Sequence, residues 1–570
     1  MRLLRRHPTE RQRTLGYAAL MTYCLAASAL AGEPATGPLA APPSAASTTP
    51  TAASATPPRL LPLPPITEVQ PLGAPATAPN PVAPAVYRLD TENTQATAAR
   101  LQALEARVLE LEAEKAQRAA PLPATSEPSK SITESVVGSD KALEARWNHG
   151  LDFTSKSKDF HVHVGGRTQY DNSFFANDDA LTVPPSAGGI GPQPNSFQFR
   201  RGRLRIEGTM YENFDFAAEY DFVNTLAPAS PSVTQPVVAV PGVTDLWGTL
   251  KYLPIVGNFR FGSMKEPIGM EHVNSSRYLP FIERSFLQDA VFGPFNNGFT
   301  PGVMIFKVRE DQLATWAIGW FSAQNSIFGY GVGPESAVTG RLTWLPMYDE
   351  PSQGRYLLHL GIAGSVRGAD QGQVRIRTRG NIRSGPPGVL NPIYADTGPM
   401  AATTEDYLAA EAAMVSGPLL LQAEFTGIIV TNAVQPYQPP AVPVDRGTPY
   451  FWGAYAQALW FLTGEHSNYS RQRASFDRLT PNENFFLLRS RTGRVRGSGA
   501  WQIGARWDTM NLNSGGINGG VLNGFTFGVN WYWNPNMKIQ MNYDLTHRGS
   551  VQQVGPGFIN AWGLRYAMDF

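Results

Sequence analysis

Residues 524–545 read GFTFGVNWYWNPNMKIQMNYDL, and this stretch decides the fold class. Its first half places apolar side chains at alternate positions: Phe525, Phe527, Val529, Trp531 and Trp533. After the turn at residues 534–536 the same spacing continues: Met537, Ile539, Met541, Tyr543 and Leu545. Since successive side chains of a strand point to opposite faces, the pattern predicts an antiparallel hairpin with one apolar face and one polar face.

The same alternation recurs from about residue 147 to the end of the chain, in segments of about ten residues separated by Gly, Pro, Asn and Asp. About sixteen strands are expected, starting near residues 159, 196, 213, 243, 257, 300, 312, 337, 355, 404, 418, 450, 499, 522, 537 and 559. A soluble β-sandwich also alternates. Short turns interleaved with long loops, and an apolar last strand, WGLRYAMDF, that ends on an aromatic residue, favour a transmembrane antiparallel β-barrel.

Composition agrees with an exported β protein. The net charge of the 570 residues is only +1, which gives no bulk charge for binding nucleic acid. After the N-terminal region, no segment offers the roughly 20 apolar residues that a transmembrane helix needs. An even number of strands would return both ends of the barrel to the periplasm. The expected location is therefore the bacterial outer membrane.

The N-terminal region divides into four short parts. Residues 1–31 combine arginines, an apolar run and an Ala-Leu-Ala ending, as a secretory signal peptide does; they contain the sole cysteine, Cys24, so no disulfide is expected. Residues 32–86 are a Pro/Ala/Thr-rich disordered linker, and residues 121–146 are a second linker before the barrel at 147–570. Between them, residues 87–120 form a short coiled coil or a solvated single helix, with apolar side chains at heptad spacing: Leu101, Leu104, Val108 and Leu111.

A row of arginines marks the expected lumen. Residues 199–208 read FRRGRLRIEG, in which Leu204 and Ile206 take the lipid-facing positions. The inward positions then belong to Arg201, Arg203 and Arg205, because an arginine facing lipid costs about 2–4 kcal/mol near the midplane. Arg200 has the lipid-facing parity and is expected at the outer end of the strand, where the register can break. The same rule turns further basic residues inward: Arg167, Lys251, Arg260, Lys307, Arg341, Arg367, Arg506 and Arg565.

Arginines in a water-filled pore attract anions, and the planar guanidinium matches phosphate. In the alternative, the arginines are neutralised by lumenal carboxylates: Asp215, Glu219, Asp221 and Asp508. The stretch 265–300 is too long for a turn and is expected to narrow the pore, with these polar groups: Lys265, Ser275, Ser276, Arg277, Glu283 and Arg284. A second run, QVRIRTRGNIR at 373–383, either folds over or into the pore or forms a solvated outer hairpin.

One connection does not fit the strand count. Residues 462–499 should be a short periplasmic turn and are much longer, so they contain either an insertion or a missed pair of strands.

Six stretches of the chain resemble a known family. They are GGRTQYD, FRRGRLRIEGTMYENFDFAAEYDF, FGSMKEPIGMEHVNSSRYLPFIERS, AYAQALWFLTGE, GAWQIGARWD and FGVNWYWNPNMKIQMNYD, in family order over most of residues 148–570. They resemble the phosphate-selective porin O and P family. The resemblance implies a homotrimer of sixteen-stranded barrels, in which an arginine ladder leads to a narrow cationic eyelet.

By that resemblance, Arg167, Arg200 and Arg201 are ladder positions. Ser275, Ser276 and Arg277 are the eyelet loop, with Lys265 just before it. The further ladder arginines are Arg375, Arg377 and Arg379.

The function that follows is passive diffusion of small anions, phosphate or polyphosphate, with outer-membrane lipids and a second and third copy as partners. The alternative is a general or weakly selective porin whose coiled coil tethers the membrane to cell-wall peptidoglycan. A barrel enzyme would need a nucleophile beside His161 or His163, and neither that partner nor further metal ligands are evident from spacing. No enzyme activity, cofactor, metal or nucleic acid is expected.

Overall fold

The computed structural model describes residues 106, 136–226, 239–292, 298–323, 335–385, 391–435, 442–490, 493–549 and 556–570. The chain divides into two compact units, residues 1–127 and 128–570, and the second contains every described residue except Ala106. The signal peptide, the first linker and, apart from Ala106, the coiled coil therefore lie outside the described residues and stay predictions. Among the described residues, no helix is both long and apolar enough to cross a bilayer.

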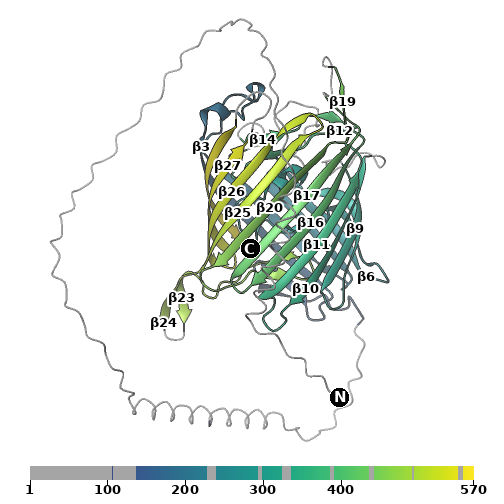
Figure 1. Ribbon diagram of the computed structural model, residues 1–570. Helices are drawn as coiled ribbons and strands as arrows, with labels where there is room; N and C mark the ends of the chain where they lie inside the picture. Colours follow the sequence, from purple (N-terminus) through teal and green to yellow (C-terminus); the bar gives the residue numbers. More distant parts are fainter. Residues whose placement is uncertain are drawn as a thin grey trace, which may run out of the picture. The chain divides into compact units, whose positions relative to one another are not determined.

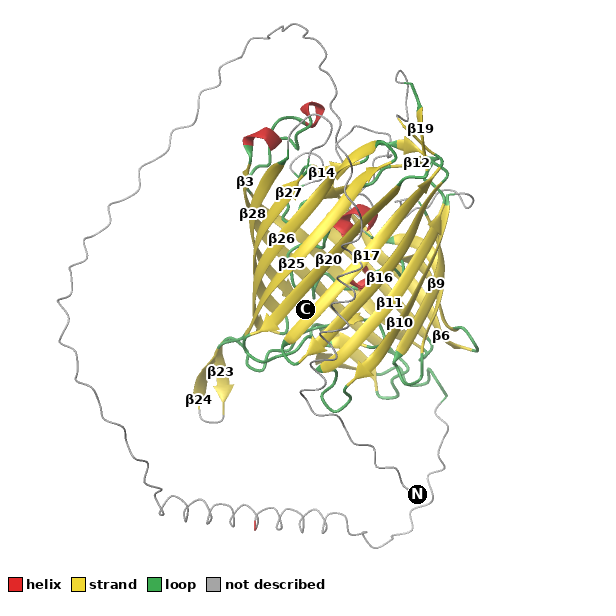
Figure 2. Cartoon of the chain, in the orientation of Figure 1, coloured by secondary structure: helices red, strands yellow, loops and turns green. Residues whose placement is uncertain are grey.

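Sixteen antiparallel strands close into one barrel (Figures 1 and 2). They are β3 (His161–Asn177), β4 (Ser196–Met210), β5 (Phe214–Leu226), β6 (Ala239–Leu253), β7 (Gly257–Met264), β8 (Thr300–Val308), β9 (Ala314–Ser322), β10 (Ser336–Tyr348), β11 (Tyr356–Arg367), β16 (Thr404–Ser416), β17 (Leu419–Thr431), β20 (Tyr450–Phe461), β25 (Ala500–Ser514), β26 (Ile517–Asn534), β27 (Met537–Arg548) and β28 (Gly557–Asp569). The barrel closes because β28 pairs with β3. The predicted strand count is confirmed, and the largest error in a strand start is at β26, which begins at Ile517 instead of 522.

A small hairpin extends the sheet beyond the barrel. Strands β1 (Leu143–Trp147) and β2 (Leu151–Ser155) pair with each other, and β2 pairs with the first residues of β3. The hairpin begins within residues 121–146, which the sequence predicted to be a linker. All five residues of β1 are exposed, so this strand has no buried face to produce an alternating pattern.

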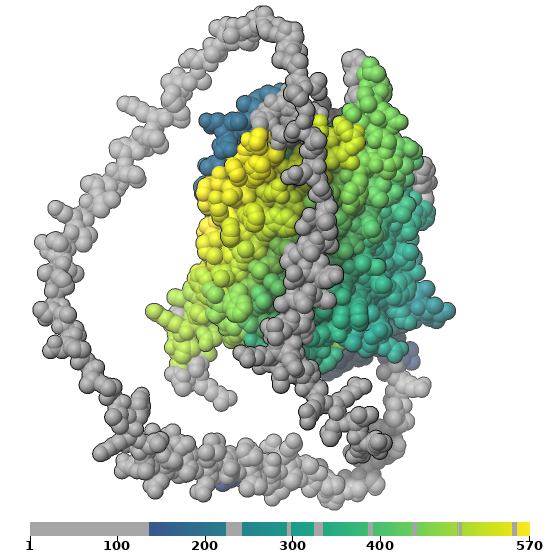
Figure 3. Space-filling model, in the orientation of Figure 1, coloured from purple at the N-terminus to yellow at the C-terminus, as the bar shows by residue number. Residues whose placement is uncertain are grey.

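The two faces of the barrel wall follow the alternation. On β4, Leu204 and Ile206 are each 40% exposed on the outside, whereas Arg203, which precedes Leu204, is 7% exposed. Figure 3 shows the outside of the wall, in which the yellow C-terminal strands lie beside the green strands of the middle of the chain. Because the outward side chains are apolar and the charged ones point inward, the wall suits a bilayer.

The carboxy terminus forms two backbone hydrogen bonds with the first part of β3. Phe570 donates its N–H to the carbonyl oxygen of Gly166 at 3.0 Å, and Gly166 donates to the Phe570 carbonyl at 2.7 Å. A Cβ atom on the neighbouring Gly165 would lie 2.3 Å from the Phe570 carbonyl oxygen. The glycine pair therefore allows the close approach of the chain end that completes the barrel.

Two long loops fold into the lumen. We call residues 265–299 the first inward loop; its helices α3 (Met270–Val273) and α4 (Phe286–Phe292) are buried, and α4 contacts the wall strands β20 and β25. Helical turns are visible inside the barrel in Figure 2. The second inward loop, residues 368–403, contains β12 (Gln373–Val374), β13 (Arg377–Arg379), β14 (Ile393–Asp396) and β15 (Met400–Ala401). Strand β13 packs on α4, so residues 373–383 are not a solvated outer hairpin.

The remaining strands lie at the ends of the barrel. Strands β18 (Ala433–Gln435) and β19 (Val444–Gly447) join β12 and β15 in a small sheet. The connection 462–499 contains two hairpins, β21 (Tyr469–Ser470) with β22 (Ser475–Phe476) and β23 (Phe486–Ser490) with β24 (Gly493–Gly497). Neither hairpin enters the barrel sheet, so the connection is an insertion. The short 3₁₀ turns η1 (Asp179–Leu181) and η2 (Pro185–Ala187) follow β3.

Candidate pore-lining site

A β-bulge turns two consecutive arginines into the lumen. Where β3 pairs with β4, Gln169 lies opposite Arg201 and Tyr170 lies opposite Phe199, so Arg200 is the extra residue. Arg200 and Arg201 are only 7% and 4% exposed. A bulge shifts the parity of a strand by one position. The lipid-facing parity of Arg200 is therefore wrong, because the register breaks at this position, and all four arginines of 200–205 point inward.

The bulge delivers these arginines to a carboxylate of the first inward loop. Arg200 Nε donates to Glu283 Oε1 at 2.7 Å, and Arg201 lies 3.7 Å from the same carboxylate. Two further arginines reach it: Arg565 at 3.0 Å and Arg383 at 3.3 Å. Burial by itself raises the pKa of Glu283, but the four arginines outweigh it and hold the pKa well below its usual range.

The charges around Glu283 do not balance. Arg565 also pairs with Asp171 at 2.7 Å, and Arg383 pairs with Asp289 at 2.9 Å. Arg379 pairs with Asp289 as well, at 2.6 Å. The connected set thus holds five arginines and three carboxylates, a formal excess of two positive charges: Arg200, Arg201, Arg379, Arg383 and Arg565 against Asp171, Glu283 and Asp289. We call it the Glu283 cluster.

A second group of ion pairs is better balanced. Glu219 accepts from Arg167 at 2.7 Å and from Arg203 at 2.8 Å. Arg203 also binds Asp221 at 2.7 Å, and Arg205 binds Asp245 at 2.6 Å. All four carboxylates that the sequence offered as neutralising partners are paired: Asp215 with Lys251, Glu219 and Asp221 as above, and Asp508 with Arg506. The neutralised-arginine alternative thus holds for this part of the wall.

Three cations near these pairs have no carboxylate within ion-pair distance among the described residues. Lys265 Nζ donates to the carbonyl oxygens of His272 and Asn274 at 2.6 and 2.9 Å. Arg284 donates to the carbonyls of Glu271 and Asn274, both at 2.8 Å. Burial and the nearby Arg284 lower the pKa of Lys265 well below its usual range. An anion beside the amine would offset both effects.

The third of these cations, Arg260, lies on the wall strand β7. Its guanidinium lies 3.8 Å from the Trp247 ring centre and donates to Thr249 at 2.8 Å. Stacking on an aromatic ring leaves the charge of the arginine in place.

The predicted eyelet residues lie at the periplasmic end of the first inward loop. Ser275 Oγ accepts from Arg167 at 3.2 Å, and the Ser276 carbonyl accepts from Gln169 at 3.1 Å, while the Ser276 hydroxyl is buried without a hydrogen-bond partner. Arg277 lies 3.4 Å from Asp569, close to the end of β28. The loop thus crosses from β7 to the wall formed by β3 and β28.

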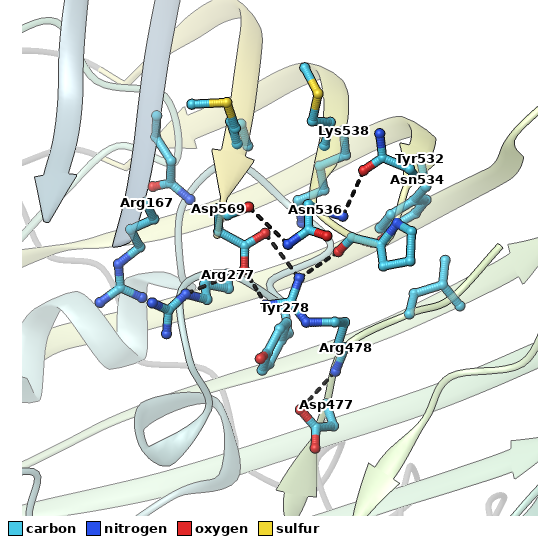
Figure 4. A pocket seen from close by; sticks show the side chains of 16 residues that line it. Arg167, Arg277, Tyr278, Asp477, Arg478, Tyr532, Asn534, Asn536, Lys538 and Asp569 are labelled. Atoms are coloured by element: carbon cyan, nitrogen blue, oxygen red, sulfur yellow. Dashed lines mark hydrogen bonds and ion pairs between the residues drawn. The ribbon is translucent and has the colours of Figure 1, made fainter. Parts of the chain in front are cut away.

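Arg277, together with Arg167 and Gln169, lines a pocket at the periplasmic mouth (Figure 4). Four cations and two carboxylates line it: Arg167, Arg277, Arg478 and Lys538 with Asp477 and Asp569. Arg478 binds Asp569, and Lys538 donates to the Leu279 carbonyl at 2.8 Å. Arg167 is also paired with Glu219 and Asp477 with Arg473, so the lining residues alone do not give the charge balance of the mouth.

The arginines of the second inward loop are spread over its depth. Arg375 pairs with Asp396 at 2.6 Å, and Arg377 lies opposite Asp396 in the β13–β14 ladder. Arg379 is 5% exposed against α4 and belongs to the Glu283 cluster. Only one of the three predicted ladder arginines of this loop therefore joins the arginines of β4.

Four members of the Glu283 cluster were not predicted as site residues: the carboxylates Asp171 and Asp289 and the arginines Arg383 and Arg565. The apolar neighbours Leu564 and Tyr566 predicted that Arg565 points inward. Nothing in the sequence indicated that Arg565 pairs with Glu283. Arg383 ends the run QVRIRTRGNIR with the same parity as Arg375, Arg377 and Arg379, but Gly380 and Asn381 separate it from them, and the predicted set stopped at Arg379.

A closed sixteen-stranded barrel with a charged interior and inward loops defines a porin of the outer membrane, a channel rather than an enzyme. The profile of the phosphate-selective porin O and P family matches residues 163–554, and the chain belongs to this family. The family resemblance read from the sequence is thus confirmed.

Two proteins and two solved structures illustrate what this chain is similar to. Porin O of Pseudomonas aeruginosa is 23% identical over 459 residues, which cover 75% of this chain and 93% of that protein. An uncharacterized protein of Caulobacter vibrioides is 24% identical over 227 residues, 39% of this chain and 41% of that one. Among solved structures, the outer-membrane channel DcaP of Acinetobacter baumannii has a TM-score of 0.40 at 11% identity and covers 73% of this chain and 99% of its own. An anion-selective porin from Comamonas acidovorans has a TM-score of 0.40 at 9% identity, with 72% and 100% covered.

Proposed function

We propose that this chain passes small anions, phosphate and polyphosphate among them, by passive diffusion through the lumen that its two inward loops narrow. The observation that carries the proposal is the Glu283 cluster, in which five arginines share three carboxylates. An uncompensated positive charge in a narrow, poorly hydrated passage lowers the free energy of an anion there and raises that of a cation.

The arrangement suits an oxyanion in particular. Guanidinium groups donate two parallel hydrogen bonds to a phosphate, and Arg200 and Arg201 are neighbours on one strand that the bulge turns to the same side. Glu283 occupies the donors of Arg200 in the absence of an anion. A passing phosphate competes with this carboxylate, so it is bound weakly enough to leave, as conduction requires.

We assign graded roles to the predicted residues. Arg200 and Arg201 with Arg379 form the central anion site. Lys265, Ser275, Ser276 and Arg277 donate to the anion on the periplasmic side, together with Arg167. Arg203 and Arg205 are held by several carboxylates and contribute less, whereas Arg260 adds charge to the wall; Arg375 and Arg377 collect anions at the outer end.

The family and the relative named Porin O support phosphate as a permeant anion. We further propose that three copies assemble into a homotrimer in outer-membrane lipid, after removal of residues 1–31 as a signal peptide. The heptad pattern at 87–120 supports a role of that segment in assembly or in tethering to peptidoglycan.

Phosphate block of the chloride current tests the proposal. With the full-length protein in planar bilayers bathed in chloride, adding phosphate should reduce the current along a saturating curve, because phosphate resides longer among the arginines than chloride. The variant Arg200→Gln should shift that curve to higher phosphate concentrations. A chloride current that phosphate leaves unchanged at every concentration would reject phosphate binding in the lumen.

A further inference from the structure

The hairpin β23–β24 is an amphipathic, basic element outside the barrel sheet. Its register pairs Leu488 with Val495 on one face, and Arg489 with Arg494 and Leu487 with Arg496 on the other. Arg496, two residues after Arg494, shares the arginine face because side chains alternate along a strand. Val495 is 45% exposed, and the three arginines are exposed too. The hairpin therefore presents an apolar face and a basic face that the barrel does not cover.

The three arginines have no carboxylate partner within ion-pair distance among the described residues. This distinguishes them from most basic side chains at the same end of the molecule, such as Arg309 and Arg473, which bind Asp311 and Asp477. Three uncompensated cations on a two-stranded ribbon repel one another unless an anionic partner lies across them.

An aromatic cluster fixes the root of the hairpin at the lipid-facing side of the wall. Phe485 packs against Trp531 and Trp533, with ring centres 4.4 and 5.4 Å apart, and its N–H donates to the Trp533 carbonyl at 2.6 Å. Trp531 stacks on Trp501 at 4.8 Å. Trp531 and Trp533 have the same parity on β26 as Phe525 and Phe527, which are 49% and 52% exposed on the outer face.

The cluster also fixes the depth of the hairpin in the membrane. It lies where β26 turns into β27 and where the insertion leaves β20, the barrel end at which β3 begins and β28 ends. Both chain ends of an even-stranded barrel lie in the periplasm, so this is the periplasmic rim. Tryptophan clusters on an outer barrel face mark the level of the lipid head groups. Figure 1 shows β23 and β24 projecting from this rim.

We propose that the β23–β24 hairpin binds the head groups of anionic phospholipids in the periplasmic leaflet. Leu488 and Val495 face the hydrocarbon boundary, while Arg489, Arg494 and Arg496 donate hydrogen bonds to the phosphodiester oxygens. Free phosphate would not explain the exposed apolar face, and a hairpin rooted on lipid-facing tryptophans lies outside the lumen through which solutes pass. The proposal is independent of the anion selectivity of the pore.

Tryptophan fluorescence provides the test, because Trp501, Trp531 and Trp533 lie at the root of the hairpin. The full-length protein is reconstituted with brominated phosphatidylglycerol or brominated phosphatidylcholine, and quenching gives the relative affinity for the two lipids. A cationic side chain near an anionic surface changes the relative affinity for the anionic lipid about fivefold, so three arginines set an upper limit of about a hundredfold. We expect a preference for phosphatidylglycerol of at least about tenfold, which the triple variant Arg489→Gln, Arg494→Gln and Arg496→Gln lowers to near unity.

A matched variant controls for the loss of charge. Lys156→Gln, Lys158→Gln and Arg309→Gln remove three exposed positive charges at the same barrel end and should keep the preference for phosphatidylglycerol. Heat-modifiable migration in gels shows that each variant retains its barrel. Equal affinity for both lipids in the unchanged protein, or an unchanged preference in the triple variant, overturns the proposal. Loss of the preference on adding excess inorganic phosphate would identify a site for free phosphate and overturn it too.

Discussion

Replacing Arg201 by glutamine should lower the preference of the channel for anions. Arg201 donates to the side-chain oxygen of Gln169 at 2.7 Å and lies 3.7 Å from Glu283, the longest of the four arginine contacts to that carboxylate. Glutamine keeps an amide that can bind Gln169, so the variant removes the charge with little change in packing. It reduces the formal excess of the Glu283 cluster from two positive charges to one.

Coulomb's law gives the size of the effect. An anion in the cluster lies roughly 6 Å from the guanidinium, where the attraction is about 0.7 kcal/mol in a medium like water and about 3 kcal/mol at an effective dielectric constant of about 20. Since about 1.4 kcal/mol corresponds to a factor of ten, the local anion concentration should fall between about threefold and about a hundredfold.

Reversal potentials in a potassium chloride gradient across a planar bilayer measure this change as the ratio of anion to cation permeability. The control is Arg309→Gln, which removes the same charge from the exposed turn between β8 and β9 and should leave the ratio unchanged. Equal ratios for the unchanged protein and Arg201→Gln would refute the assignment of Arg201 to the anion path. An equal fall in both variants would show that the ratio reports net charge rather than the lumen.

Three further predictions concern the loops and the closure of the barrel. Glu283→Gln should raise the ratio of anion to cation permeability, opposite to Arg201→Gln, because it removes a negative charge from the same cluster; an unchanged ratio would place the anion elsewhere. Asp289→Asn removes the carboxylate that holds Arg379 of the second inward loop, at a cost of about 3–5 kcal/mol, and should increase amide hydrogen exchange over residues 373–401 while exchange in β26 stays slow. Gly165→Val places a Cβ 2.3 Å from the carbonyl oxygen of Phe570 and should reduce the fraction of heat-modifiable barrel in outer membranes, whereas folding as efficient as in the unchanged protein would contradict this account of closure.

Most of the wall could be predicted from the sequence because lipid imposes a simple rule. Every second side chain of a membrane strand must be apolar, so the strands appear as alternating runs, and the predicted starts of β4, β7, β8 and β27 coincide with the structure. Strand β1 lies outside that rule, because all five of its residues are exposed, and the sequence predicted a linker for residues 121–146, in which most of β1 lies.

The site was harder to predict than the wall. Parity failed at Arg200, because a bulge depends on the register with β3 and not on the residues of β4 alone. The family resemblance assigned Arg200 to a ladder position, whereas parity assigned Arg203 and Arg205 to the lumen, and the structure turns all three side chains inward. Alternation within one strand cannot distinguish Arg200 and Arg201 from Arg203 and Arg205. The first two contact Glu283 of the first inward loop, whereas the other two pair with carboxylates of the wall.

The remaining features of the site, which the sequence did not predict, depend on contacts between segments that are distant along the chain. Glu283 contacts arginines of β4, β28 and the second inward loop. The most distant of them along the chain, Arg565, is 282 residues away. The sequence shows that each of these side chains points inward, but not which carboxylate it meets, since that depends on the course of two long loops without a repeating pattern. The uneven balance of charge around Glu283 could therefore be seen only in the structure.

The central claim is that the excess of positive charge in the lumen makes this porin a path for anions. The reversal potential of the unchanged protein in a potassium chloride gradient tests it most directly. The account predicts a potential close to the equilibrium potential of chloride. A potential close to the equilibrium potential of potassium would contradict it.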